Sequence, residues 1–266
     1  MRWLGAIASA LLFAACATSP LGRSQLMLVS DAQMDQMGVQ AFEQLKAEQK
    51  VSTDPAQNRY VVCVARAILT ALPAGQGQGA WEVRVFDDDS ANAFALPGKK
   101  IGVHTGLLKV ARNQHQLATV IGHEVAHVLG RHSGERVSAE MLKQGIAQGA
   151  STLVGAAGDP SSPLHGAAMQ ALGIGVNLGG LAYGRGHESE ADEYGLRLMA
   201  EAGFDPRESV PLWRNMDAAN QGQRPPEFLS THPSPETRIA DLSRQIPKEL
   251  PKMQRARASG RNPRCG

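Results

Sequence analysis

The chain has 266 residues, of which 42% are hydrophobic and 20% are charged, and its formal net charge is +2. This composition excludes a disordered or fibrous chain, and the nearly balanced charge argues against nucleic acid or another polyanion as a partner. We therefore expect one folded domain, residues 16–247, between two short terminal segments.

The N-terminus has the features of a secretion signal. An apolar stretch follows Met1 to Trp3 and ends before Cys16. It is too short to span a bilayer as a mature helix, but residues 1–15 suit a signal peptide. Ala14-Ala15-Cys16 is typical of a bacterial lipoprotein cleavage site, although Phe13 stands where leucine is usual. We predict acylation at Cys16 and a lipid-anchored periplasmic protein, with Ala17 favouring the outer membrane.

Two helices and a small sheet are predicted next. Helical periodicity runs from Asp31 to Lys50 and again from Pro55 to Leu72, the second behind Asp54 as its N-cap. An alternating strand follows at residues 81–86. Leu96-Pro97-Gly98-Lys99 predicts the turn of a hairpin.

The most informative motif is His123-Glu124-Val125-Ala126-His127, on a predicted helix between Asn113 as N-cap and Gly130. Histidines four positions apart on a helix point the same way. They can supply two ligands of a catalytic zinc, with Glu124 as general base at the open position. The motif alone is equally compatible with a helix whose histidines are simply hydrogen-bonded.

Two candidates exist for a third ligand. His132 lies one position before the third histidine of a metzincin, where Ser133 stands instead. A shift of one residue turns a helical side chain by about 100°, so we interpret His132 either as facing solvent or as contacting a metal ligand without binding the metal itself. Glu188 and Asp192 are four apart and share a helix face. Glu188 can complete a His/His/Glu site while Asp192 orients a zinc histidine, unless both belong to a solvated charged face.

These blocks resemble the gluzincin peptidases that include the CAAX prenyl protease and HtpX, especially their BepA/LoiP-like periplasmic lipoprotein branch. The similarity covers Trp81 to Leu242 and includes the segment from Asn92 to Leu108 and the block Thr231-His232-Pro233-Ser234-Pro235-Glu236-Thr237-Arg238-Ile239. It implies an α+β, mostly α-helical, zincin-like metalloprotease domain with a small β-sheet whose edge strand precedes the zinc helix. It also implies one Zn²⁺ per chain.

The same resemblance implies roles for further residues. In the family, the histidine and arginine of the last block stand over the zinc, which assigns the substrate carbonyl or the tetrahedral intermediate to His232 and Arg238. The edge-strand segment implies that Asn92, Ala93 and Phe94 bind an extended peptide by strand addition. By the same analogy, the substrates are misfolded or misassembled envelope proteins, and the outer-membrane assembly machinery is an expected partner.

The remaining segments carry further expectations. The small-residue-rich interval from Ala139 to Gly184 predicts a helical hairpin, which we interpret as a lid, and a helix runs from Asp205-Pro206 to about Ala219. The basic tail, residues 248–266, is predicted to be flexible or attracted to anionic lipid. In an oxidising compartment, Cys63 and Cys265 either pair with each other or remain free thiols.

Two alternatives to a protease stay open. One is a periplasmic chaperone or assembly lipoprotein that retains zinc but cleaves little, with His232 occupying the open zinc position. The other is a purely structural zinc protein. A closed site with four protein ligands would favour either alternative, because a catalytic zinc keeps one position for water.

Overall fold

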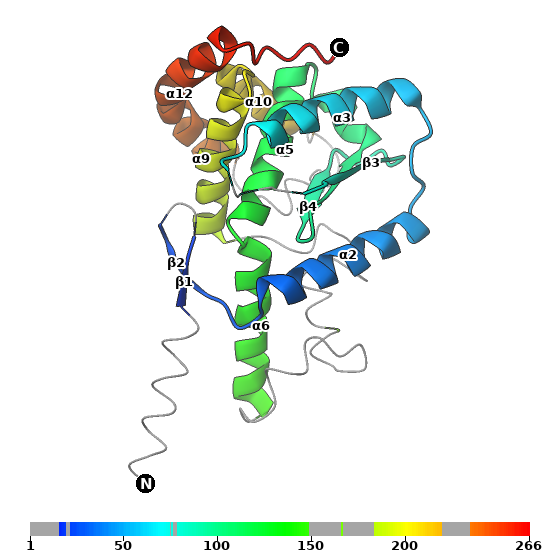
Figure 1. The fold of residues 1–266 in the computed structure, drawn as a ribbon, viewed down its shortest axis with the longest axis vertical. Coiled ribbons are helices and arrows are strands. Elements are labelled where there is room, and N and C mark those ends of the chain that lie inside the picture. Colours follow the sequence, from blue (N-terminus) through cyan, green and yellow to red (C-terminus); the bar gives the residue numbers. More distant parts are fainter. Residues whose placement is uncertain are drawn as a thin grey trace.

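The computed structural model describes residues 16–19, 22–74, 76, 79–148, 166, 184–219 and 235–266. It confirms the predicted α+β class, with many helices around a small sheet (Figure 1). The helices are α2 (Asp31–Glu48), α3 (Pro55–Thr70), α4 (Thr105–Val110), α5 (Gln114–Leu129), α6 (His132–Gln148), α9 (Arg185–Glu201), α10 (Ser209–Ala219) and α12 (Pro235–Ala258), with a 3-10 turn η2 (Pro206–Glu208). The strands are β1 (Cys16–Thr18), β2 (Ser24–Leu26), β3 (Glu82–Phe86), β4 (Ala93–Leu96) and β5 (Lys100–His104).

The main sheet has the strand order β3-β5-β4. Strand β5 pairs in parallel with β3 and antiparallel with β4, with Ala93 opposite Val103. The predicted hairpin turn joins β4 to β5, and Gly98 and Lys99 both adopt positive φ angles there, 77° and 64°. Strand β4 therefore lies at one end of this sheet, in agreement with the predicted edge strand before the zinc helix.

Helix α5 is the central element of the core. Leu117, Ile121 and Val125 are fully buried on it, and it packs against α3, β4, α9 and α10 (Figure 1). The predicted N-cap is present, because the Asn113 side chain accepts hydrogen bonds from the backbone N–H groups of His115 and Gln116, both at 3.0 Å. Helix α5 thus holds its motif in a fixed, water-poor setting.

Helices α5 and α9 cross with their backbones in close contact, where each carries a glycine. A Cβ atom on Gly122 would lie 2.9 Å from the carbonyl oxygen of Gly195, and a Cβ atom on Gly195 would lie 2.7 Å from the backbone nitrogen of His123. Real Cβ atoms almost never approach so closely. The two glycines therefore let α9 place its first two turns beside the histidines of α5.

The C-terminal segment is ordered, contrary to the predicted flexible tail. Helix α12 continues to Ala258, and Met253 and Ala256 are buried on it. The prediction of a flexible tail was wrong here because the basic composition and two prolines inside the helix, Pro247 and Pro251, concealed its apolar face.

The last residues are also held in place. A disulfide joins Cys63 of α3 to Cys265, which is the pairing that the sequence left open. The backbone N–H of Cys265 donates to the Gln114 side chain at 2.8 Å. The C-terminus is thereby attached to both α3 and the start of α5.

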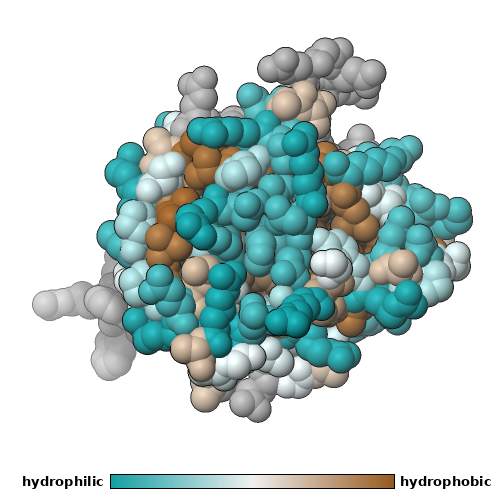
Figure 2. All heavy atoms as spheres, turned by 90° about the horizontal axis from the view of Figure 1, so that it is seen from above, coloured by the Kyte–Doolittle hydropathy of each residue, from teal (hydrophilic) through white to brown (hydrophobic). Residues whose placement is uncertain are grey.

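The surface seen in Figure 2 is mostly hydrophilic, with apolar side chains in separate patches. In the described part of the chain, no helix combines the length and the apolar character needed to cross a membrane. Helix α6 forms the beginning of the predicted helical hairpin, up to Gln148. Apart from Gly166, the rest of that hairpin, up to residue 183, and with it the proposed lid, lies outside the described residues.

Replacing Gly195 by alanine is expected to force α9 away from α5. Inserting a methyl group into so tight a contact costs about 1–3 kcal/mol of unfolding free energy, and the same displacement should weaken zinc binding. Gly186→Ala is the matched control on α9, because a Cβ atom at that position would have nothing within 4 Å. Denaturant midpoints measure the effect, and equal midpoints for the two variants would contradict the close crossing.

Candidate metal centre

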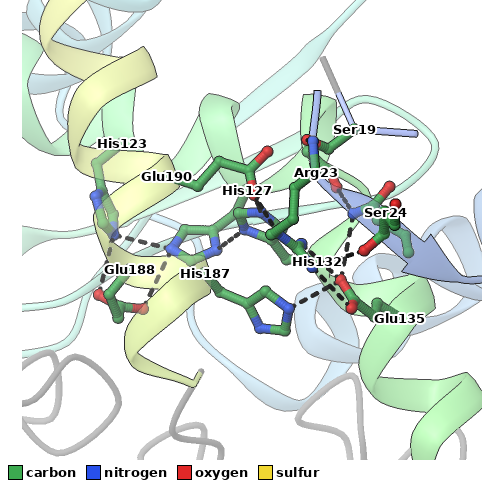
Figure 3. Close-up of polar contacts among 12 residues, drawn as sticks. Ser19, Arg23, Ser24, His123, His127, His132, Glu135, His187, Glu188 and Glu190 are labelled. Carbon is green, nitrogen blue, oxygen red and sulfur yellow. Dashed lines mark hydrogen bonds and ion pairs between the residues drawn. The ribbon is translucent and has the colours of Figure 1, made fainter. Parts of the chain in front are cut away.

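Three buried side chains converge from two helices. His123 and His127 lie one turn apart on α5, and Glu188 lies in the first turn of α9. Their exposed fractions are 2%, 1% and 5%. One ligand atom from each residue lies within 4.8 Å of the others, so that they can hold a metal ion together. The structure thus brings together the three ligands predicted from the sequence (Figure 3).

The spacing of these atoms suits zinc. The Nε2 atoms of His123 and His127 are 2.9 Å apart, and they lie 3.6 Å and 3.4 Å from the two carboxylate oxygens of Glu188. A tetrahedral zinc with bonds of about 2.0–2.1 Å separates its ligand atoms by roughly 3.3 Å. Two imidazoles and one carboxylate are also a donor set typical of catalytic zinc.

Burial shapes the charge state of these groups. Burial, reinforced by the positive charge of Arg238, lowers the pKa of His123 to about 4, so its ring is neutral at neutral pH and has a lone pair for a metal. Burial raises the pKa of Glu188 to about 8 despite the nearby Arg238. A divalent cation would oppose this rise by favouring the carboxylate.

Glu124 follows the first histidine and faces strand β4. It is 4% exposed, and its carboxyl group accepts a hydrogen bond from the backbone of Ala95 in β4. Burial, followed by repulsion from Glu188, raises the pKa of Glu124 well above its usual value. A carboxyl group with an affinity for protons next to the ligand set is suited to proton transfer.

Asp192 and Arg238 form a second layer on the side of His123. The Oδ1 atom of Asp192 lies 3.0 Å from Nδ1 of His123, which is the place predicted for an orienting carboxylate. Arg238, on α12, donates from Nη2 and Nε to the two oxygens of Asp192 at 2.6 and 2.7 Å. Its Nη1 lies 2.8 Å from Glu188, and its guanidinium stacks on Trp213 at 4.0 Å.

Arg238 therefore directly contacts both Glu188, the candidate metal ligand, and Asp192. Burial acts to raise the pKa of Asp192, but the charge of Arg238 and the hydrogen bonds from His123 and Arg238 outweigh it, and the pKa is lowered. Asp192 consequently stays ionised and can hold the His123 ring by its Nδ1–H.

The sequence pointed only in part to the second layer on the side of His127. His132 is fully buried rather than on the solvent side, and its Nδ1 lies 2.8 Å from Nδ1 of His127. Of the two interpretations left open for His132, the buried contact with a candidate ligand agrees with the structure, and the solvent-side position does not. Glu190 on α9 and Arg23 before β2 extend this layer outward (Figure 3). Glu188, two positions earlier, was the only sequence signal for Glu190, and Arg23 had none.

Strand β4 lies within the described residues, whereas the start of the last predicted block does not. Asn92 precedes β4, and Ala93 and Phe94 begin it; all three are buried. The Phe94 ring packs edge-on against Phe42 and His104, at 6.3 and 6.1 Å between centroids, so only its backbone is suited to contact a peptide. His232 lies outside the described residues.

A helix carrying His-Glu-x-x-His, a carboxylate ligand from a second helix and an edge strand beside them define a metallopeptidase. The chain belongs to peptidase family M48, whose sequence profile matches residues 55–246. This confirms the family expected from the motifs.

The relatives agree with this assignment. The chain is 30% identical over 245 residues to the beta-barrel assembly-enhancing protease of Escherichia coli (strain K12), which covers 90% of this chain and 49% of that protein. It is 33% identical over 215 residues to the mitochondrial metalloendopeptidase OMA1 of Schizosaccharomyces pombe, covering 80% of this chain and 60% of that protein. The chain thus spans about half the length of the curated relatives that it matches.

Replacing Arg238 by glutamine is expected to destabilise the metal-free protein by about 3–5 kcal/mol, because the buried and ionised Asp192 loses its cation and Glu188 loses its contact with the guanidinium. Arg244→Gln is the control on the same helix, since Arg244 is exposed and pairs with Asp241 one turn away; its effect should stay below about 1 kcal/mol. Urea unfolding in the presence of a chelator measures both. An Arg238→Gln protein as stable as the Arg244→Gln protein would refute the structural role of this ion pair.

Proposed function

We propose that the chain is a zinc-dependent endopeptidase that cleaves misfolded or misassembled proteins of the bacterial cell envelope. The convergence of His123, His127 and Glu188 next to Glu124 carries the proposal. Membership of peptidase family M48 supports it. Among the described residues, one cluster of possible metal ligands is found, which agrees with a single Zn²⁺ per chain.

The chemistry follows from the positions of the side chains. When bound, zinc supplies Lewis acidity and a water whose pKa is lowered toward about 7. Glu124 then takes the proton of the attacking water and returns it to the leaving amine. Asp192 keeps His123 in the tautomer whose Nε2 faces the metal.

We assign different tasks to the two residues that the family resemblance placed over the metal. Arg238 holds Glu188 and Asp192 in position, because its guanidinium already contacts both carboxylates. His232 is left to stabilise the negative charge that develops on the substrate carbonyl oxygen. One such donor lowers the activation barrier by about 3–4 kcal/mol.

Substrate binding is proposed to occur by strand addition at β4. This strand lies at the end of the sheet, and the contact between Ala95 and Glu124, the proposed general base, supports this binding mode. Helix α2 packs against β4, and the four residues of the strand are buried. Peptide addition at Ala93 and Phe94, with Asn92 next to them, therefore requires the covering elements to move.

The envelope location is part of the same proposal. One relative is named as a protease that enhances beta-barrel assembly, and residues 1–16 suit a lipoprotein signal with Cys16 as the acylated residue. We propose a periplasmic protein anchored by its lipid, at the outer membrane, that acts near the outer-membrane assembly machinery.

Glu124→Gln is expected to lower casein or envelope-protein cleavage by about 10²- to 10⁴-fold, which is the usual contribution of general acid–base catalysis. Zinc content should remain at the wild-type level because Glu124 is not a ligand. Glu193→Gln, the same substitution at an exposed site on α9, is the control and should leave activity unchanged. Equal activity in the wild type and in Glu124→Gln would refute the proposed endopeptidase activity. Zinc-bound wild type without cleavage would favour a chaperone.

Cys16→Ser is expected to abolish uptake of a labelled fatty acid by the full chain expressed in bacteria. The matched control is the double variant Cys63→Ser/Cys265→Ser, which lacks the disulfide but keeps Cys16 and should take up label. Incorporation of the labelled fatty acid into the Cys16→Ser protein would refute acylation at Cys16.

A further inference from the structure

A chain of contacts leads from metal ligand His127 to the N-terminal hairpin formed by β1 and β2 (Figure 3). His127 Nδ1 lies 2.8 Å from His132 Nδ1, and His132 Nε2 lies 3.3 Å from Glu190 Oε2. Arg23, the residue before β2, donates from Nε to the same oxygen of Glu190 at 2.7 Å. Four residues from α5, α6, α9 and the hairpin thus form one connected line.

The hydrogen bonds in this line have a consistent direction. His127 faces His123 and Glu188 with Nε2, so metal binding through that atom leaves a proton on its Nδ1. That N–H donates to Nδ1 of His132, which must then carry its own proton on Nε2 and donate it to Glu190. In the reverse arrangement, a lone pair of His132 would face a carboxylate oxygen, which is repulsive.

Glu190 and the ring of His132 are both held by further contacts. The Ser19 side chain donates a hydrogen bond to Glu190, and Arg23 also donates to both oxygens of Glu135, at 2.9 and 2.7 Å. Glu135 in turn accepts from Nε2 of His187 at 2.9 Å, whose ring stacks on His132 at 4.6 Å between centroids. His132 is therefore fixed both by its polar edge and by its face.

The hairpin also contacts the end of the metal-binding helix itself. Gln25 of β2 is 2% exposed, and its Nε2 donates to the carbonyl oxygen of Gly130, where α5 ends. Residues from the N-terminal hairpin thus reach the last turn of α5 by two separate routes, through Arg23 and through Gln25.

We propose that His132 and Glu190 are positioning residues that keep His127 in the tautomer and orientation that bind the metal, and that Arg23 completes this support. The inference rests on the proposed function only in taking His127 as a metal ligand. It makes the segment just after Cys16 an outer part of the metal site, because Arg23 holds the carboxylate on which the orientation depends.

The test measures the zinc dissociation constant by chelator competition, together with the thermal midpoint of each metal-free protein. His132→Phe keeps a ring but removes both nitrogens, and we expect it to weaken zinc binding about 10- to 100-fold, as for other outer-shell partners of ligating histidines. Glu190→Gln keeps a hydrogen-bond acceptor but removes the negative charge, and Arg23→Met removes the guanidinium that holds Glu190. Both should weaken binding by a smaller factor.

A second readout reports on orientation directly. In the metal-free wild type, ¹⁵N chemical shifts should show His127 protonated at Nδ1, whereas in His132→Phe the Nε2-protonated tautomer should become populated. A purely structural role of His132 would not change this tautomer. His115→Gln is the matched control, because His115 lies two turns before His123 on α5, and it should leave both readouts unchanged.

The outcomes separate this inference from the proposed function. A wild type that binds no zinc refutes the proposed metal site. A wild type that binds zinc, with folded His132→Phe binding equally tightly, overturns only the positioning role. If His132→Phe does not fold, the positioning role is overturned by a zinc affinity at the wild-type level in both Glu190→Gln and Arg23→Met. A loss of zinc affinity in His115→Gln as large as that in the other variants would also overturn the positioning role, since it would indicate general loosening of α5.

Discussion

The metal centre depends on the close crossing of α5 and α9. Gly122 and Gly195 leave no side chain between the two backbones, so the carboxylates on the first turns of α9 reach the histidines of α5. Alanine at either position would bring Cβ within 3.0 Å of backbone atoms. The ligand set is thus created by a packing contact, and the remaining polar groups are arranged around it.

Burial then determines how the charges around the site are arranged. Glu124, Glu188 and Asp192 are all less than a tenth exposed, and isolated buried carboxylates are unfavourable. Arg238 lies between Glu188 and Asp192 and is covered by the Trp213 ring. A metal cation at the three ligands would add the positive charge that this cluster favours. The same low-dielectric setting strengthens the electrostatic interactions on which peptide hydrolysis at zinc depends.

The outer layers on the two sides of the metal differ in origin. On the side of His123, the partners Asp192 and Arg238 both lie within the family-matched residues 55–246. On the side of His127, the line ends at Arg23, which precedes that region. If Cys16 carries the proposed lipid, the anchoring segment and the outer support of His127 belong to one short stretch of chain.

The sequence by itself determined the features that depend on neighbours along the chain. Helical spacing placed His123, Glu124 and His127 on one face, the same spacing linked Glu188 to Asp192, and the caps at Asp54 and Asn113 were readable because capping is local. Only the tertiary structure decided the contacts of His132 and Glu190 and the course of the C-terminal helix. At Arg131, with a φ of 57°, the chain turns between α5 and α6, so helical spacing could not predict where His132 points. Long-range contacts such as that of Arg23 with Glu190 follow from how the helices pack, which no local pattern encodes.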